Sequence, residues 1–351
     1  MGHQATTTTN SYRARMREGI GRLPSACFAS VMAAGIVSRA AASVGAHTVA
    51  RLLLSLGVLL YVMLVGATAW RIAAHRGRVA QDAADPARAF GFFTFVAASD
   101  VLATNLATGD WRPFAIVLLT GGALCCAALL RTVVTAARSR PARADGSWFL
   151  LVVGPQSVVV AATELRAGPA TAVAGLCCWA VGVLAYVTIT SLVWTRLRRH
   201  GVPPAELTPV YWIAMGAGAI SVLAGAGVLL SASWYEPVRT VVTAVLMLVA
   251  GWATVLIPVL LGAGAWRHIR HRVPLRYEPS WWSAVFPIGM YAVATQQAAR
   301  ATGAGLWEKA GQAAAWAALT AWALVGTAIL AQWPRSGPTS LRGRSRRPPA
   351  G

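Results

Sequence analysis

Residues 52–70 read LLLSLGVLLYVMLVGATAW, an apolar run that carries no charged side chain. A helix of about 20 such residues is long enough to cross the hydrocarbon core of a bilayer. Ten runs of comparable length and character follow one another along the chain, so the sequence predicts ten membrane segments. Their expected ranges are 24–45, 52–70, 89–108, 113–136, 147–165, 169–194, 209–230, 238–266, 279–298 and 310–333.

Positive charge alternates from gap to gap between these segments. Counted with the arginines at adjoining segment ends, the amino tail, every second gap and the carboxyl tail hold 24 of the 31 lysines and arginines. The other five gaps hold 6, and Arg39 lies inside the first segment. Because positively charged loops stay on the cytoplasmic side, we expect a multi-pass protein of the cell membrane with both termini in the cytoplasm. An odd number of segments would break this alternation.

The composition also indicates an integral membrane protein. Apolar residues make up 56% of the chain and charged residues 12%, and the mean hydropathy is +0.56. The net charge of +20 lies beside segment ends, which membrane orientation and anionic lipid explain better than nucleic-acid binding does. We expect a basic cytoplasmic tail over residues 1–22, an all-α membrane domain of ten helices over 23–333, and a disordered basic cytoplasmic tail over 334–351.

Several chemistries lack the residues that they need. The five cysteines fall within apolar segments and form no CxxC motif, and the six histidines lie in tails or loops. We therefore expect no metal site of the usual kinds and no cofactor. The single lysine, Lys309, has no phosphate-binding loop around it, which excludes an ATP-driven pump within this chain. A membrane enzyme or receptor is a minor alternative, because the sequence places no group of nucleophile, base and metal ligands together in or beside the segments.

The odd-numbered segments from the third to the ninth share a pattern. Each opens with aromatic residues and then runs through small residues, glycine or proline, whereas the even segments are more uniformly apolar. The openings are Phe90, Phe92 and Phe93; Trp148 and Phe149; Tyr211 and Trp212; and Trp281 and Trp282. The contrast predicts five helical hairpins in which the odd helix faces an interior and the even helix faces lipid. The alternative explanation of this pattern is that glycine and proline are generally enriched in membrane helices.

Four stretches carry a resemblance to a known family. They are SVMAAGIVS (30–38), FFTFVAASDVLATNL (92–106), YWIAMGAGAISVLAGA (211–226) and YEPSWWSAVFPIGMYAVAT (277–295). With them the chain resembles the TehA-type tellurite-resistance and C4-dicarboxylate (malic acid) transporter family, which includes the guard-cell slow anion channels. The resemblance covers about residues 23–333, and the motif of the ninth segment is its most specific part.

The resemblance implies ten helices in five hairpins around a central pore, assembled as a homotrimer with one pore per subunit. It implies passage of small anions such as malate, sulfite, chloride or nitrate. It also implies that Phe286, in the motif WSAVFP, plugs the pore, whereas the alternative for this residue is ordinary packing between helices. Positions expected to line or kink the pore are Gly35, Ser38, Gly154, Pro155, Gly216, Gly218, Pro287 and Gly289.

Two charges inside the segments depart from the family pattern. Arg39 lies near the outer end of segment one, where its side chain can reach the membrane surface. Asp100 lies deeper and has two interpretations. It pairs with Arg39 or with a hydroxyl on a neighbouring helix, or it is a proton-titratable group beside the pore, in which case Asp100 and Arg39 are the candidate proton-coupling residues. The second interpretation would make the protein a proton-coupled carrier for dicarboxylates instead of a passive anion channel.

We predict that a reporter fused after Arg344 is active only in the cytoplasm, because every second gap is rich in arginine. The measurement is the activity of a pair of fusions, one to a reporter that works only inside the cytoplasm and one to a reporter that works only outside. Activity of the external reporter alone would reject the count of ten segments.

Overall fold

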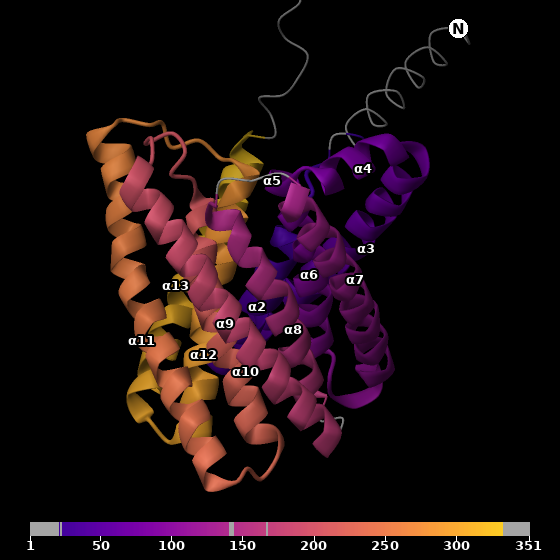
Figure 1. Ribbon diagram of the computed structural model, residues 1–351, viewed down its shortest axis with the longest axis vertical. Helices are drawn as coiled ribbons and strands as arrows, with labels where there is room; N and C mark the ends of the chain where they lie inside the picture. Colours follow the sequence, from indigo (N-terminus) through magenta and orange to yellow (C-terminus); the bar gives the residue numbers. More distant parts are fainter. Residues whose placement is uncertain (1–20, 22, 140–143, 166–167, 333–351) are drawn as a thin grey trace, which may run out of the picture.

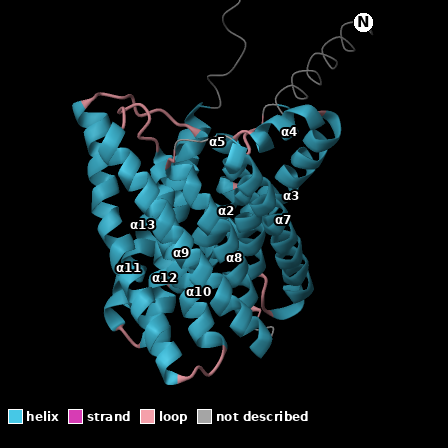
Figure 2. Ribbon diagram, in the orientation of Figure 1, coloured by secondary structure: helices cyan, strands magenta, loops and turns pink. Residues whose placement is uncertain are grey.

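The chain folds into a bundle of helices (Figure 1). The computed structural model describes residues 21, 23–139, 144–165 and 168–332, and within these ranges no strand occurs (Figure 2). Apart from Gly21, the tails predicted at 1–22 and 334–351 lie outside the described residues. Each predicted apolar segment overlaps one long helix, and these are α2 (Ala29–Ser43), α3 (His47–Ala74), α6 (Phe93–Asn105), α7 (Arg112–Ser139), α8 (Leu150–Glu164), α9 (Pro169–His200), α10 (Ile213–Ser231), α11 (Glu236–Ala265), α12 (Trp282–Thr302) and α13 (Gly305–Gln332).

Among the described residues, seven helical stretches are long and apolar enough to cross a membrane. They are His47–Ala74, Gly109–Val133, Gly146–Glu164, Ala170–His200, Pro209–Ser231, Glu236–Arg270 and Gly305–Ala331. Two shorter apolar helices, Ala29–Ser43 and Phe90–Asn105, accompany them. The protein is therefore an all-helical membrane protein, while the count of ten crossings stays a prediction.

Five of the long helices form the interior. Helices α2, α6, α8, α10 and α12 contact one another in that order, and α12 contacts α2, so the five close a ring. Each is followed in the chain by a helix that packs on it from outside, namely α3, α7, α9, α11 or α13. In the ring stretch Pro209–Ser231, 83% of an 18-residue apolar segment is buried. In the outer stretch His47–Ala74, the corresponding share is 11%. This difference agrees with the contrast between odd and even segments.

The aromatic openings of the ring helices coincide with a shared local structure. A 3₁₀ turn precedes four of them: η1 (Phe90–Phe92) before α6, η3 (Gly146–Phe149) before α8, η4 (Pro209–Trp212) before α10 and η6 (Pro279–Trp281) before α12. Such turns tighten the start of a helix and satisfy some of its unpaired backbone groups. The sequence repeat thus marks the places where the ring helices begin.

Glycines let the ring helices approach one another closely. A Cβ atom built on Gly216 of α10 would lie 2.9 Å from Cγ and 3.3 Å from Cα of Pro287 of α12. One on Gly289 would lie 2.9 Å from the side chain of Ile36. Inside a membrane, where apolar burial gives helices little reason to associate, such close packing is a principal source of stability. Three further glycines of the ring helices also make tight contacts: Gly35 against Val101 of α6, Gly154 against Phe93 of α6, and Gly218 against Tyr186 of the outer helix α9.

Two short helices, which follow α3 and precede α6 in the chain, lie at one end of the bundle (Figure 1). They are α4 (Arg76–Ala84) and α5 (Pro86–Ala89). Asp82 of α4 accepts hydrogen bonds from Arg71 at the end of α3 and from Arg88 of α5, the latter at 2.8 Å. Burial raises the pKa of the Asp82 carboxyl, but the hydrogen bonds and charges of the two arginines outweigh burial and hold this pKa below its ordinary value. The carboxylate therefore ties the three helices together in its charged form.

We predict that Gly216→Ala destabilises the protein by about 1–3 kcal/mol, because the rigid ring and backbone of Pro287 cannot move away from a new methyl group. Gly251→Ala is the matched control, since a Cβ atom on Gly251 of α11 meets nothing within 4 Å. The measurement is thermal unfolding of both purified variants in detergent. Equal stability of the two variants would contradict the close approach of α10 and α12.

Candidate functional site

Each ring helix turns one stripe of side chains toward the interior of the ring. The stripe residues recur every three, four or seven positions, as expected for one face of a helix. They are Ala29, Met32, Ile36 and Arg39 of α2; Thr94, Val101 and Thr104 of α6; Leu150, Ser157 and Val160 of α8; Ile213, Ile220 and Leu223 of α10; and Ser283, Phe286 and Met290 of α12. These stripes line two cavities that share all five helices.

The first cavity, here called the vestibule, has a volume of about 170 Å³ and lies where the ring helices begin. Its wall includes Gly91, so it lies at the same end of the bundle as α5. Among its described lining residues, four carry hydroxyl side chains, namely Ser25, Thr94, Ser147 and Ser283, and none is charged. Of these hydroxyls, three already donate within the protein: Ser25 to Arg88 O, Thr94 to Gly91 O and Ser147 to Asp145 Oδ1. The vestibule wall is therefore only weakly polar.

The second cavity, here called the distal cavity, lies further along the same stripes and has a volume of about 10 Å³. That space is about enough for one water molecule. Its wall combines the apolar side chains of Ile36, Val101, Val160, Ile220, Leu223 and Met290 with the polar side chains of Arg39, Asp100, Thr104 and Ser157. The interior of the ring is thus closed to any hydrated ion in this conformation.

Phe286 is the vestibule residue of α12 that lies nearest to the distal cavity along the helix. Its side chain is 2% exposed and lines the vestibule, and Met290, one helical turn further on, lines the distal cavity. Pro287, the next residue in the chain, packs on Gly216 of α10. The ring of Phe286 therefore stands at the level where the wide vestibule gives way to the narrow distal cavity.

Asp100 is completely buried in the wall of the distal cavity. Its Oδ2 accepts a hydrogen bond of 2.7 Å from the hydroxyl of Ser157 on α8. Its Oδ1 is buried and has no hydrogen-bond partner in the described part of the chain. Of the two pairings considered from the sequence, the structure contains the one with a hydroxyl on a neighbouring helix and not the one with Arg39.

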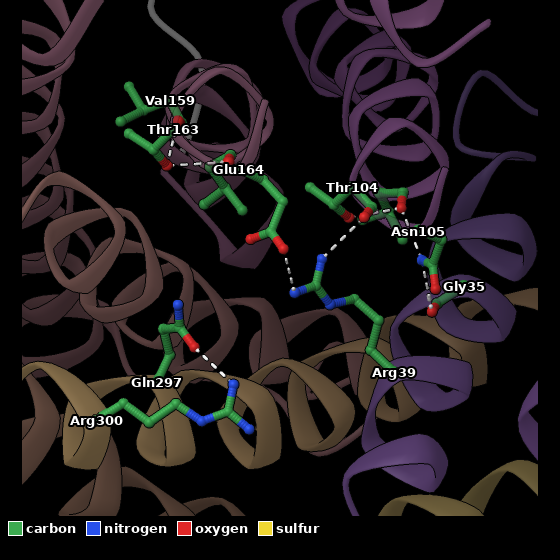
Figure 3. A network of polar contacts seen from close by, with 11 residues as sticks. Gly35, Arg39, Thr104, Asn105, Val159, Thr163, Glu164, Gln297 and Arg300 are labelled. Atoms are coloured by element: carbon green, nitrogen blue, oxygen red, sulfur yellow. Dashed lines mark hydrogen bonds and ion pairs between the residues drawn. The ribbon is translucent and has the colours of Figure 1, made fainter. Parts of the chain in front are cut away.

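Arg39 reaches across the far end of the distal cavity (Figure 3). Its Nη1 donates to the backbone oxygen of Thr104 at 3.2 Å, and its Nη2 lies 3.4 Å from Oε1 of Glu164. The side chains of Arg39 and Glu164 are 21% and 33% exposed. Figure 3 also shows Arg300 directed at Gln297 of its own helix, at 3.4 Å, and not at this pair.

Sequence reasoning did not identify Glu164 as the partner of Arg39. The missed signal is its spacing, because Glu164 lies seven residues after Ser157 and therefore on the same face of α8. Arg39 follows Ile36 by three residues on α2 in the same way. A search for polar residues in register with the stripes would have found the pair.

None of the small residues expected to line or kink the pore lines either cavity. The five glycines among them pack against neighbouring helices, and the hydroxyl of Ser38 donates to Ala50 O of α3 at 2.8 Å. Pro155 and Pro287 lie inside α8 and α12. Within the described ranges, no group of three or more His, Cys, Asp or Glu residues could hold a metal ion.

Comparison with known proteins identifies the family. Residues 22–330 match the SLAC1 family model, described as a voltage-dependent anion channel, so the chain belongs to this family. The family includes the TehA-type proteins that the four sequence stretches resemble, which confirms that resemblance. Membership implies transport of anions across a membrane by a channel or transporter and not catalysis.

Two relatives are membrane proteins of Mycobacterium tuberculosis. They come from strains CDC 1551 / Oshkosh and ATCC 25618 / H37Rv, and both are described as uncharacterized membrane proteins. Each is 43% identical to this chain over 152 residues, which cover 41% of this chain and 75% of the relative.

Proposed function

We propose that the protein conducts small anions through the interior of its helix ring, from the vestibule past Phe286 to the distal cavity and Arg39. One observation carries the proposal: all five ring helices contribute to both cavities, so the cavities lie on a common path. The substrates are malate or other C4-dicarboxylates, or inorganic anions such as chloride, nitrate and sulfite.

In this proposal ten helices cross the cell membrane as five hairpins, and three copies assemble as a trimer with one path each. The vestibule opens to the cytoplasm, because the gaps that precede the ring helices carry most of the arginines. These basic loops raise the local concentration of anions at its mouth.

Weak binding suits conduction, because an ion must leave a site as readily as it enters it. The vestibule has no charged lining residue, and three of its four hydroxyls donate elsewhere. Closure comes from the ring of Phe286, which fills the path and removes water from it. Opening requires this side chain to turn away from the ring interior.

We predict that Phe286→Ala raises anion flux at least about tenfold, because removal of the ring opens and wets the constriction. The measurement is chloride and nitrate current of the reconstituted variant, together with its abundance in the membrane. A packing role predicts lower abundance without added flux. A stable variant with wild-type current would contradict the gate assignment.

The second candidate is a proton-coupled carrier for dicarboxylates that uses Asp100. The observation that favours it is a buried carboxyl group in the wall of the path, one oxygen of which has no hydrogen-bond partner among the described residues. Such a group can take up and release a proton as the substrate passes. Arg39 then belongs to the substrate path and not to the proton site, since it pairs with Glu164.

We predict that, if the protein is a carrier, Asp100→Asn abolishes the dependence of malate uptake on a pH gradient, because the amide cannot carry the proton. The measurement is uptake into vesicles with and without an imposed gradient. Ser157→Ala is the control, because it removes the hydrogen bond to Asp100 but leaves the carboxyl group. Gradient-driven uptake that survives in Asp100→Asn would assign this residue a structural role only.

A further inference from the structure

Arg39 brings a cation into the interior of the ring. Among the described residues that line the vestibule and the distal cavity, it is the only lysine, arginine or histidine. It lies on the inward stripe of α2, three residues after Ile36, at the end of the path opposite the vestibule. Any anion that follows the path must therefore pass the guanidinium group of Arg39.

The partner of Arg39 holds it loosely. A charge-assisted N–H···O bond is commonly about 2.7–2.9 Å long and often bidentate, whereas Arg39 and Glu164 are joined by one contact of 3.4 Å. Both side chains retain some exposure to solvent. The guanidinium has five N–H donors, of which two make hydrogen bonds within the described part of the chain. The remaining donors are available to a second anion.

We propose that Arg39 and Glu164 form an exchange site for the permeating anion, an inference that rests on the proposed function. The Glu164 carboxylate is a tethered counter-anion that neutralises Arg39 when the path is empty. A permeating anion displaces this carboxylate, binds the guanidinium, and leaves when the carboxylate returns. Charge on Arg39 is compensated at each stage, and the displaced carboxylate of Glu164 is partly exposed to solvent.

The chemistry of the guanidinium indicates which anions this site favours. Its planar fork matches two oxygens of one planar oxyanion, a geometry that a spherical halide cannot use. Nitrate and carboxylates are therefore expected to bind Arg39 better than chloride. Lysine carries the same charge without the fork, so Arg39→Lys separates the effect of charge from the effect of geometry.

The test uses the full-length chain in liposomes, with Phe286→Ala present throughout so that the path is open. The initial flux of nitrate and of chloride is measured against anion concentration. Arg39→Gln should raise the half-saturating nitrate concentration about three- to fivefold, and Glu164→Gln should lower it by a similar factor. Arg39→Lys should bring the half-saturating concentrations of nitrate and chloride closer together.

Arg300→Gln is the matched control, because Arg300 lines neither cavity and contacts Gln297 of its own helix. It should leave both half-saturating concentrations unchanged. In the double variant Arg39→Gln with Glu164→Gln, the second substitution should no longer lower the half-saturating nitrate concentration, since no guanidinium remains to be released. If Glu164→Gln lowers the half-saturating nitrate concentration equally with and without Arg39, the carboxylate simply repels the anion, and the proposal of an exchange site is overturned.

Other outcomes separate this inference from the proposed function. If the Phe286→Ala protein carries neither nitrate nor chloride, the proposed function fails and the exchange site fails with it. If it carries both and the Arg39 and Glu164 variants match Arg300→Gln, only the exchange site is overturned. Should Arg39→Gln fail to reach the membrane, Arg39→Lys and Glu164→Gln carry the test, because each changes one partner conservatively.

Discussion

The close approach of five helices around one interior is the constraint on which the rest of this structure depends. Helices surrounded by lipid gain little from burying apolar surface, so van der Waals contact at short range must hold them together. Gly216 against Pro287 and Gly289 against Ile36 provide that contact at neighbouring joints of the ring. The ring in turn fixes which face of each helix points inward. The two cavities exist because these inward faces carry side chains that do not fill the space completely.

The pairing of charged side chains in the interior reflects the free-energy cost of an unpaired charge in an apolar medium. The two charged residues that line the distal cavity each find a partner on a different ring helix: Asp100 accepts from Ser157 across the joint of α6 and α8, and Arg39 spans from α2 to Thr104 of α6 and Glu164 of α8. The bonds from α6 to α2 and to α8 join helices that Gly35 and Gly154 already hold close, whereas the contact of Arg39 with Glu164 spans from α2 to α8 across α6. The same bonds define the polar part of the proposed path, so its chemistry and the stability of the ring depend on the same residues.

In the proposed function, conduction depends on the narrowness of the path and not on a strong binding site. The vestibule is apolar to weakly polar, the distal cavity holds about one water, and the aromatic ring of Phe286 lies between them. On this proposal the path conducts only after a side chain moves, and the open path binds an ion only weakly. Membership of an anion-channel family agrees with this design, since a channel needs a pathway and a gate and no catalytic group.

The sequence by itself determined the class of protein, the helical segments and the family, because apolar length, loop charge and short motifs are local properties that need no contacts to be read. The sequence also predicted which helices are buried, because their segments contain more small residues. Only the tertiary structure decided which partners meet. Glu164 pairs with Arg39, Asp100 with Ser157, and the expected pore glycines pack against neighbouring helices. These outcomes depend on the rotation of each helix about its axis, and that rotation is set by contacts between residues far apart in the chain.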